Sequence, residues 1–254
     1  MARLRAFISL SRLTFLPGGL LACALGVAVA RQEHHALSWA AYLQAQWLVT
    51  SFHLMTHYSN EYFDRESDRG AVRTPFSGGS GVLVAGELPA SLALRAALAS
   101  AASGTLAVAT FIGHGNTTTA LLGLAVGALA WAYSAPPLRL LARGLGELTT
   151  SLVVGSLVPL LAYAAQTGAI DGVALAATLP SALSVFLMMI ALEVPDLACD
   201  TASGKHNLLV RLGPRLLPRL RSVRGRSAAF VASAGVACFF ITTLAMTFAF
   251  LLRT

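Results

Sequence analysis

Residues 173–192 read VALAATLPSALSVFLMMIAL, a run of twenty residues without a charged side chain. A helix of about 20 apolar residues is long enough to cross the hydrocarbon core of a bilayer. Because a backbone in lipid must satisfy its own hydrogen bonds, such a long and uniformly apolar run predicts a membrane-spanning helix. The stretch therefore predicts a membrane protein built from helices.

Further runs of the same character surround it, at Leu13–Ala30, Ala36–Tyr58, Leu88–Ile112, Thr117–Tyr133, Leu148–Gln166 and Ala228–Leu252. The 254-residue chain is 56% apolar and only 11% charged, whereas a soluble domain carries about 25% charged residues. We therefore expect an all-α, polytopic transmembrane helical bundle with seven spans. Pro159 and Pro180 fall inside two of the runs and predict kinks there.

Lysine and arginine are unevenly distributed between the expected connecting segments. Sixteen of the eighteen fall on one side of the bundle, and only Arg31 and Arg253 fall on the other. Connecting loops rich in these cations stay in the cytoplasm, so we expect a cytoplasmic N-terminus and an outside C-terminus. The net charge of +7 follows from this bias and gives no reason to expect a nucleic acid partner. Nine of the eleven carboxylates lie on the expected cytoplasmic side as well, which predicts a polar chamber open to the cytoplasm in a protein expected in the inner (cytoplasmic) membrane.

Carboxylates follow the opening stretch directly, at Glu193, Asp196 and Asp200. Residues four apart share a helix face, so Asp196 and Asp200 are expected to point the same way. Ionisable groups at the depth of a membrane are costly and usually functional. We call Asp196 and Asp200 the second acidic row.

A first acidic row follows the Ala36–Tyr58 run, where residues 60–68 read NEYFDRESD. Asn60, Asp64 and Asp68 have the same four-residue spacing and offer the oxygen ligands that hard cations prefer. Alone, this row is also explained by a solvated, mixed-charge helix end. Two rows that end even-numbered spans on one face can converge, however, and Mg²⁺ is usually held by one or two carboxylates plus substrate phosphate oxygens. Together the rows predict a Mg²⁺–diphosphate site more readily than a calcium cage.

The paired rows resemble those of the UbiA superfamily of intramembrane prenyltransferases, whose motifs NxxxDxxxD and DxxxD follow the second and sixth helices. Further stretches are similar to the 1,4-dihydroxy-2-naphthoate polyprenyltransferase branch of menaquinone biosynthesis: Arg73–Gly81, Tyr133–Pro137, Arg143–Glu147, Gly204–Lys205 and Val210–Gly213. The sequence departs from that branch at Glu193, where the branch often has asparagine. Members generally have nine helices, so the resemblance implies a single domain over residues 1–254 that is short at its C-terminus.

The resemblance implies a Mg²⁺-dependent enzyme that transfers a polyprenyl group from a polyprenyl diphosphate to a small aromatic acceptor. The best single expectation for that acceptor is 1,4-dihydroxy-2-naphthoate, with 4-hydroxybenzoate, homogentisate or another lipid-quinone precursor as alternatives. The implied metal ligands are Asn60, Asp64, Asp68, Asp196 and Asp200, and the four aspartates are also the implied catalytic residues. The implied substrate-binding residues are Arg12, Arg73, Tyr133, Arg139 and Lys205. A transporter, or a catalytically inert member of the superfamily, remains an alternative of another class.

Two other sequence patterns are explained without a role in catalysis. His53 and His57 have a spacing seen in zinc sites and share a helix face with Asn60. No third ligand is evident, so polar packing inside the bundle is favoured. Leucines alternate with arginines over residues 208–223, which predicts an interfacial amphipathic helix in contact with membrane lipid.

Overall fold

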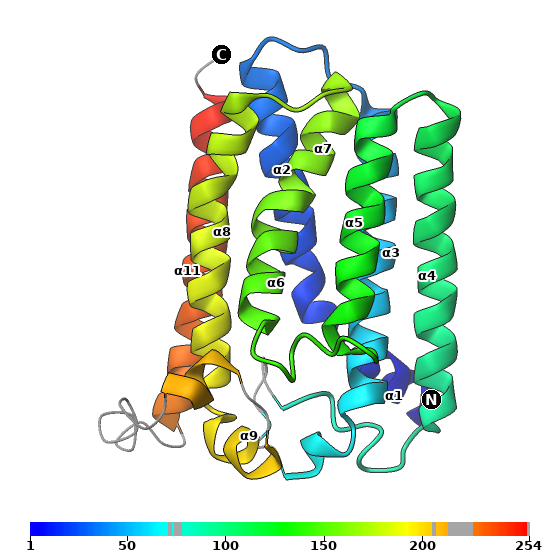
Figure 1. Ribbon diagram of the computed structural model, residues 1–254, viewed down its shortest axis with the longest axis vertical. Coiled ribbons are helices and arrows are strands. Elements are labelled where there is room, and N and C mark those ends of the chain that lie inside the picture. The colour runs from blue at the N-terminus through cyan, green and yellow to red at the C-terminus, as the bar shows by residue number, and fades with distance from the viewer. Residues whose placement is uncertain (71–72, 74–77, 205–206, 213–225, 253–254) are drawn as a thin grey trace.

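The computed structural model describes residues 1–70, 73, 78–204, 207–212 and 226–252, and all regular structure in these ranges is helical (Figure 1). The elements in chain order are α1 (Ala2–Leu10), η1 (Leu13–Phe15), α2 (Leu16–Gln32), α3 (Trp39–Asp64), η2 (Ser67–Gly70), α4 (Ala90–Gly113), α5 (Thr117–Ser134), α6 (Gly146–Leu152), η3 (Val153–Leu157), α7 (Val158–Thr167), α8 (Gly172–Glu193), α9 (Leu197–Ser203) and α11 (Arg226–Leu251). Each of the seven apolar runs expected from the sequence coincides with one of the long helices or, for Leu148–Gln166, with the continuous α6–η3–α7 segment.

In the described ranges, six helical segments are long and apolar enough to cross a membrane: Ala2–Gln32, Ala90–Gly113, Thr117–Ser134, Gly146–Thr167, Gly172–Glu193 and Ala228–Leu251. The remaining expected span is α3, a helix of 26 residues. It carries His53, His57 and Asn60 among other polar side chains, which lower its hydropathy below that of the six. Because α3 contacts α2, α4, α5 and α7, it is an inner helix of the same bundle.

The two prolines inside expected spans behave differently. Pro159 stands in the first turn of α7, directly after the π-helical turn η3, so the segment from Gly146 to Thr167 is one irregular helix. A proline has no N–H to donate to the preceding turn, and a π-helical turn absorbs the missing bond. Helix α8, by contrast, continues through Pro180 without interruption.

Helix backbones at the centre of the bundle lie very close together. A Cβ atom on Gly26 of α2 would lie 2.0 Å from the carbonyl oxygen of Pro159, and one on Gly155 would lie 2.3 Å from the Cα atom of Ala182. Small residues allow helix backbones to approach this closely. Large buried side chains, among them Leu48, Phe52 and Leu161, then fill one core between α2, α3, α5 and α7.

The two ends of the bundle differ in chemistry. The end of α3, the end of α8 and the short helix α9 lie at one end of the bundle, the same end as α1, whereas α11 finishes at the opposite end (Figure 1). Helix α9 contacts η2, so the segments that carry Asp200 and Asp68 meet. The fold therefore brings both acidic rows to a single end of the bundle.

Candidate active site

A cavity of about 280 Å³ lies inside the bundle at the end where the acidic rows meet. All five residues of the two rows line it, together with Arg12 and Tyr133. The remaining walls are mostly apolar and come from α2, α3, α5, η3, α8 and α11; they include Phe15, Val49, Phe52, Val126, Ala130, Val153, Val154, Val236 and Phe239. The cavity therefore joins a polar entrance to an apolar interior.

The first acidic row lies on the last turn of α3 and on η2. The Asn60 side-chain amide donates hydrogen bonds to Asp64 Oδ2 over 2.5 Å and to Ser134 Oγ over 3.0 Å. Arg139 Nη2 lies 3.9 Å from Asp64 Oδ1, so this buried carboxylate also has a cationic neighbour. Ser67 at the start of η2 donates to the Asp64 carbonyl oxygen over 2.8 Å, which stabilises the turn that brings Asp68 back toward the cavity.

The second acidic row begins just after α8 and continues into α9. Asp196 stands at the N-cap of α9, and Asp200 follows one turn later. Asn207 donates a hydrogen bond to Asp200 Oδ2 over 2.8 Å, and both side chains are buried. Asn207 itself lines the cavity. The sequence pattern offered no reason to select Asn207, because it follows Asp200 by seven residues and lies outside a regular helix.

A glycine-rich loop connects the two rows. The Gly78 N–H group donates to Asp196 Oδ2 over 3.2 Å, and the Ser80 N–H and hydroxyl groups donate to the two Glu61 oxygens, each over 2.6 Å. Gly79 has φ +66°, and a Cβ atom there would stand 2.8 Å from Asp68 Oδ2. The loop thus contacts carboxylates from both segments, and its glycines leave room for them.

Two further carboxylates lie beneath the second row. Glu193 lines the cavity and is 7% exposed, and its charged neighbours include Glu147 and Asp200. Glu147 is 1% exposed and accepts a hydrogen bond from the Leu208 N–H group over 2.5 Å. From the sequence, both acids are expected on the cytoplasmic side, and neither is expected to bind metal or substrate. Glu193 is therefore part of the site, and Glu147 is its buried neighbour.

The expected substrate-binding residues are not all brought together. Arg12 lines the cavity and places its guanidinium carbon 4.7 Å from the centre of the Phe15 ring. Arg139 reaches the first row through Asp64. Arg73 is exposed, its guanidinium group lies against Gly81, and it is not among the cavity-lining residues. Lys205 lies outside the described residues.

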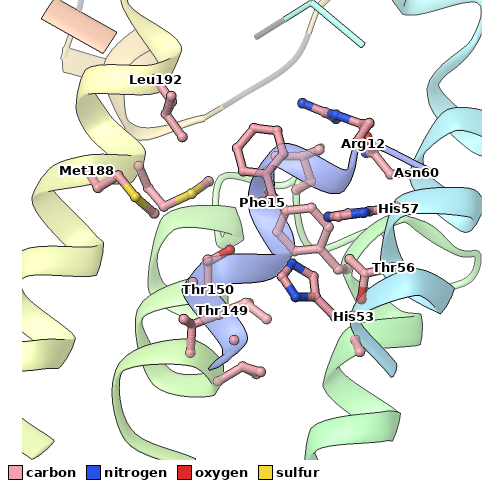
Figure 2. Close-up of a pocket in the computed structure, with 18 of the residues that line it drawn as sticks. Arg12, Phe15, His53, Thr56, His57, Asn60, Thr149, Thr150, Met188 and Leu192 are labelled. Atoms are coloured by element: carbon pink, nitrogen blue, oxygen red, sulfur yellow. The ribbon is translucent and has the colours of Figure 1, made fainter. Parts of the chain in front are cut away.

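The deeper part of the cavity has polar groups of its own. Figure 2 shows His53, Thr56 and His57 projecting from α3, with Thr149 and Thr150 on α6 and Met188 and Leu192 on α8 bordering the same space. Phe15 and Arg12 approach from the start of α2 and the turn before it. This part of the cavity offers hydrogen-bonding groups inside mostly apolar walls.

The donor set suits Mg²⁺ shared with a phosphate ligand. Among the residues that the structure describes, no three His, Cys, Asp or Glu side chains are close enough to hold a metal ion by themselves. Mg²⁺ does not need such a cage, because it keeps several waters and is commonly held by one or two carboxylates plus substrate phosphates. Carboxylate oxygens from Asp64, Asp68, Asp196 and Asp200 on one cavity fit that mode of binding.

Comparisons with known proteins agree with this arrangement. The profile of a family described as the UbiA prenyltransferase family matches residues 19–253. The chain is 29% identical over 122 residues to 2-carboxy-1,4-naphthoquinone phytyltransferase of Synechocystis sp., covering 48% of this chain and 39% of that protein. It is 26% identical over 160 residues to 1,4-dihydroxy-2-naphthoate octaprenyltransferase of Bacillus subtilis, covering 63% of this chain and 51% of that protein. The chain thus spans about half or less of the length of these curated relatives.

The fold is also similar to a solved structure, a UbiA homolog from Archaeoglobus fulgidus bound to DMAPP and Mg²⁺. The TM-score is 0.64 with 16% sequence identity, and the match covers 96% of this chain and 97% of the other. This likeness supports the arrangement of the helices over almost the whole chain.

Proposed function

This chain belongs to the UbiA prenyltransferase family, and on that premise we propose that it is a Mg²⁺-dependent prenyltransferase. The reaction transfers a polyprenyl group from an allylic diphosphate to an aromatic acceptor and releases pyrophosphate. One observation carries the proposal: two acidic rows from distant parts of the sequence line one cavity whose other walls are mostly apolar.

The polar end of the cavity binds the diphosphate. Asn60, Asp64, Asp68, Asp196 and Asp200 are the residues that would hold Mg²⁺. The bound metal supplies positive charge that neutralises the diphosphate as a leaving group. Neighbouring groups orient these ligands: Arg139 and the Asn60 amide contact Asp64, the Gly78 N–H group contacts Asp196, and Asn207 contacts Asp200. Arg12, Arg139 and Lys205 are proposed to contact the phosphate oxygens, and Arg73 joins them if its side chain leaves Gly81.

The apolar interior protects the reacting carbon. When the carbon–oxygen bond of the allylic diphosphate breaks, the allylic group becomes cationic and would be captured by water. Phe52, Val126 and Val154 are among the side chains that keep water away from it. Tyr133 also lines the cavity, and its ring face can stabilise a nearby cation. We propose that the polyprenyl tail continues between helices into membrane lipid.

The best-supported acceptor is 1,4-dihydroxy-2-naphthoate. The allylic carbon must be attacked by a ring carbon, and hydroxyl groups give a ring the electron density for this attack. Both curated relatives carry names of naphthoate-type prenyltransferases, which agrees with the resemblance in Arg73–Gly81 and Arg143–Glu147. A 4-hydroxybenzoate or homogentisate acceptor would meet the same chemical requirement.

Carboxyl-labelled acceptors distinguish these substrates. Membranes that contain the protein are incubated with Mg²⁺, an allylic diphosphate and either 1,4-dihydroxy-2-naphthoate or 4-hydroxybenzoate, and products are identified by mass spectrometry. We expect prenylation of the naphthoate at the carbon that bears its carboxylate, with release of labelled carbon dioxide in step. Prenylated 4-hydroxybenzoate that retains its label would overturn the acceptor assignment and leave the enzyme class intact. No prenylated product from any aromatic tested would contradict the proposed function.

A further inference from the structure

The cavity contains a histidine pair that the proposed chemistry leaves unused. His53 and His57 stand one turn apart on α3, and both line the cavity. Their ring centres are 4.5 Å apart, and the rings meet edge to face. Figure 2 shows both side chains on the side of α3 that faces the cavity, below Arg12 and Asn60 in the direction of the apolar interior. The pair therefore lies next to the apolar interior that is proposed to shelter the allylic carbon, which the acceptor ring must reach for a carbon–carbon bond to form.

The hydrogen bonding of His57 defines which of its nitrogens can serve a ligand. Nδ1 lies 2.9 Å from the carbonyl oxygen of Ser11. A carbonyl oxygen can only accept, so Nδ1 carries the hydrogen and donates it. His57 is 8% exposed, and a charge on so buried a ring is costly. In the neutral ring, Nε2 therefore presents a lone pair and accepts hydrogen bonds.

That lone pair is unused by the protein. Within the part of the chain that the structure describes, Nε2 of His57 and both ring nitrogens of His53 have no hydrogen-bond partner. Both histidines line the cavity, so these nitrogens are within reach of a ligand that brings a hydrogen-bond donor. The Phe15 ring meets the His57 ring edge to face with centres 5.9 Å apart. A flat aromatic molecule with a hydroxyl group matches these surroundings.

We infer that Nε2 of His57 accepts a hydrogen bond from a phenolic hydroxyl group of the aromatic acceptor. This inference rests on the proposed function, because it assigns a residue to the acceptor of that reaction. A lone pair at this atom disfavours the oxygens of a diphosphate, which carry no hydrogen at neutral pH. It also disfavours the carbonyl oxygens of a quinone, which have no hydrogen to donate. His57 thus selects hydroxylated rings, the form that is electron-rich enough to be alkylated.

The test compares two stable probes, 1-naphthol and 1-methoxynaphthalene. Only 1-naphthol has a hydroxyl hydrogen with which to donate a hydrogen bond to Nε2. Their binding to the purified full chain is measured by equilibrium dialysis without any diphosphate, with correction for partition into detergent. We expect the wild-type protein to bind 1-naphthol about tenfold more tightly, the value of one hydrogen bond in an apolar site. Equal binding of the two probes would overturn the inference.

Two substitutions separate ligand binding from a purely structural role. His57→Asn retains an amide N–H near the Nδ1 position for the Ser11 carbonyl oxygen but has no acceptor at the Nε2 position. His57→Gln can place its carbonyl oxygen near the Nε2 position. We expect the asparagine variant to lose the preference for 1-naphthol while unfolding at the wild-type temperature, and the glutamine variant to keep it. The inference is contradicted if the asparagine variant keeps the preference for 1-naphthol, whatever the glutamine variant does.

The matched control is His114→Asn, since His114 is exposed just after α4 and is not among the cavity-lining residues. It should bind both probes as the wild-type protein does. Because the binding assay contains no diphosphate, its result is independent of turnover. A protein that discriminates between the probes but forms no prenylated product would contradict the proposed function alone. A protein that forms product but does not discriminate would contradict only the role of His57.

Discussion

At the scale of single residues, the site depends on carboxylates that neighbouring groups hold in place. Asp64 receives a hydrogen bond from Asn60 and lies near the Arg139 guanidinium, Asp196 receives one from the Gly78 N–H group, and Asp200 receives one from Asn207. Such contacts orient each carboxylate before a ligand arrives. Preorganised electrostatic groups are worth most in a site that excludes water.

The first prediction concerns one aspartate from each row. Asp64→Ala and Asp196→Ala should each lower turnover by at least about a hundredfold, because both rows are needed to hold the metal and the diphosphate. Pyrophosphate release by the purified variants at saturating Mg²⁺ measures this. Glu66→Ala is the control, since Glu66 is exposed and its ion pairs within the described residues are with Arg65 and Arg69. Near-normal rates in either aspartate variant would show that one row is enough.

The second prediction uses two glycines with similar backbone conformations. Gly79 has φ +66° and Gly86 has φ +71°, but only at Gly79 would a Cβ atom crowd Asp68, at 2.8 Å from Oδ2. Each alanine substitution costs about 1–2 kcal/mol for the left-handed conformation. Gly79→Ala should in addition lower kcat/KM about tenfold or more by displacing Asp68. Equal kcat/KM values for the two alanine variants would mean that the position of Asp68 does not matter.

The sequence could predict the rows but not their partners. Four-residue spacing is a property of one helix, so Asn60, Asp64 and Asp68 could be grouped from the sequence. The contact of Gly78 with Asp196 joins residues 118 positions apart, and that of Ser11 with His57 joins residues 46 apart. Such contacts depend on how the helices pack, which no local pattern encodes. The position of the Arg73 side chain could not be predicted either. The resemblance implied a contact with phosphate, and in the structure the guanidinium group lies against Gly81.

At the scale of helices, the apolar runs predicted the elements to within a few residues. The run Thr117–Tyr133 became α5 (Thr117–Ser134), and Val173–Leu192 became α8 (Gly172–Glu193). The π-helical turn η3 could not be predicted, because a proline inside a helix can be accommodated in several ways. The polar residues of α3 are visible in the sequence. That they line the cavity follows only from the packing of the helices.

The third prediction tests the close approach of α2 and α7. Gly26→Ala would place a Cβ atom 2.0 Å from the Pro159 carbonyl oxygen, so the two backbones must separate. We expect a loss of about 1–3 kcal/mol in the free energy of unfolding, measured by denaturant titration in detergent. Gly113→Ala is the matched control, because nothing lies within 4 Å of the new Cβ atom. The idea fails if both variants have the stability of the wild-type protein.

At the scale of the whole molecule, the bundle has a polar end and an apolar interior. The acidic rows and Glu193, with its neighbour Glu147, gather at one end, and α1 lies at that same end while α11 finishes at the other (Figure 1). The chain is therefore an integral membrane protein in which the site and the first helix share one side. Which side faces the cytoplasm follows from the distribution of Lys and Arg and stays a prediction.

The fourth prediction is this orientation. Reporter fusions at the two ends of the chain should give opposite answers, with the N-terminal reporter in the cytoplasm, because sixteen of the eighteen cationic residues are expected from the sequence on the side of the N-terminus. A cysteine introduced at Glu66, in a variant whose Cys23, Cys199 and Cys238 are replaced by serine, should stay unmodified when intact cells are treated with a membrane-impermeant thiol reagent. Labelling at this position would place the acidic rows outside the cell and reverse the orientation.

The central claim is that the two acidic rows form one Mg²⁺-dependent diphosphate site for prenyl transfer. The most direct test incubates the purified protein with geranyl diphosphate, Mg²⁺ and 1,4-dihydroxy-2-naphthoate and measures pyrophosphate and prenylated product together. The account predicts that the two are released in equal amounts, that excess chelator abolishes both, and that added Mg²⁺ restores both. Turnover that continues unchanged in excess chelator, or the absence of pyrophosphate release with this and every other hydroxylated aromatic, would contradict it.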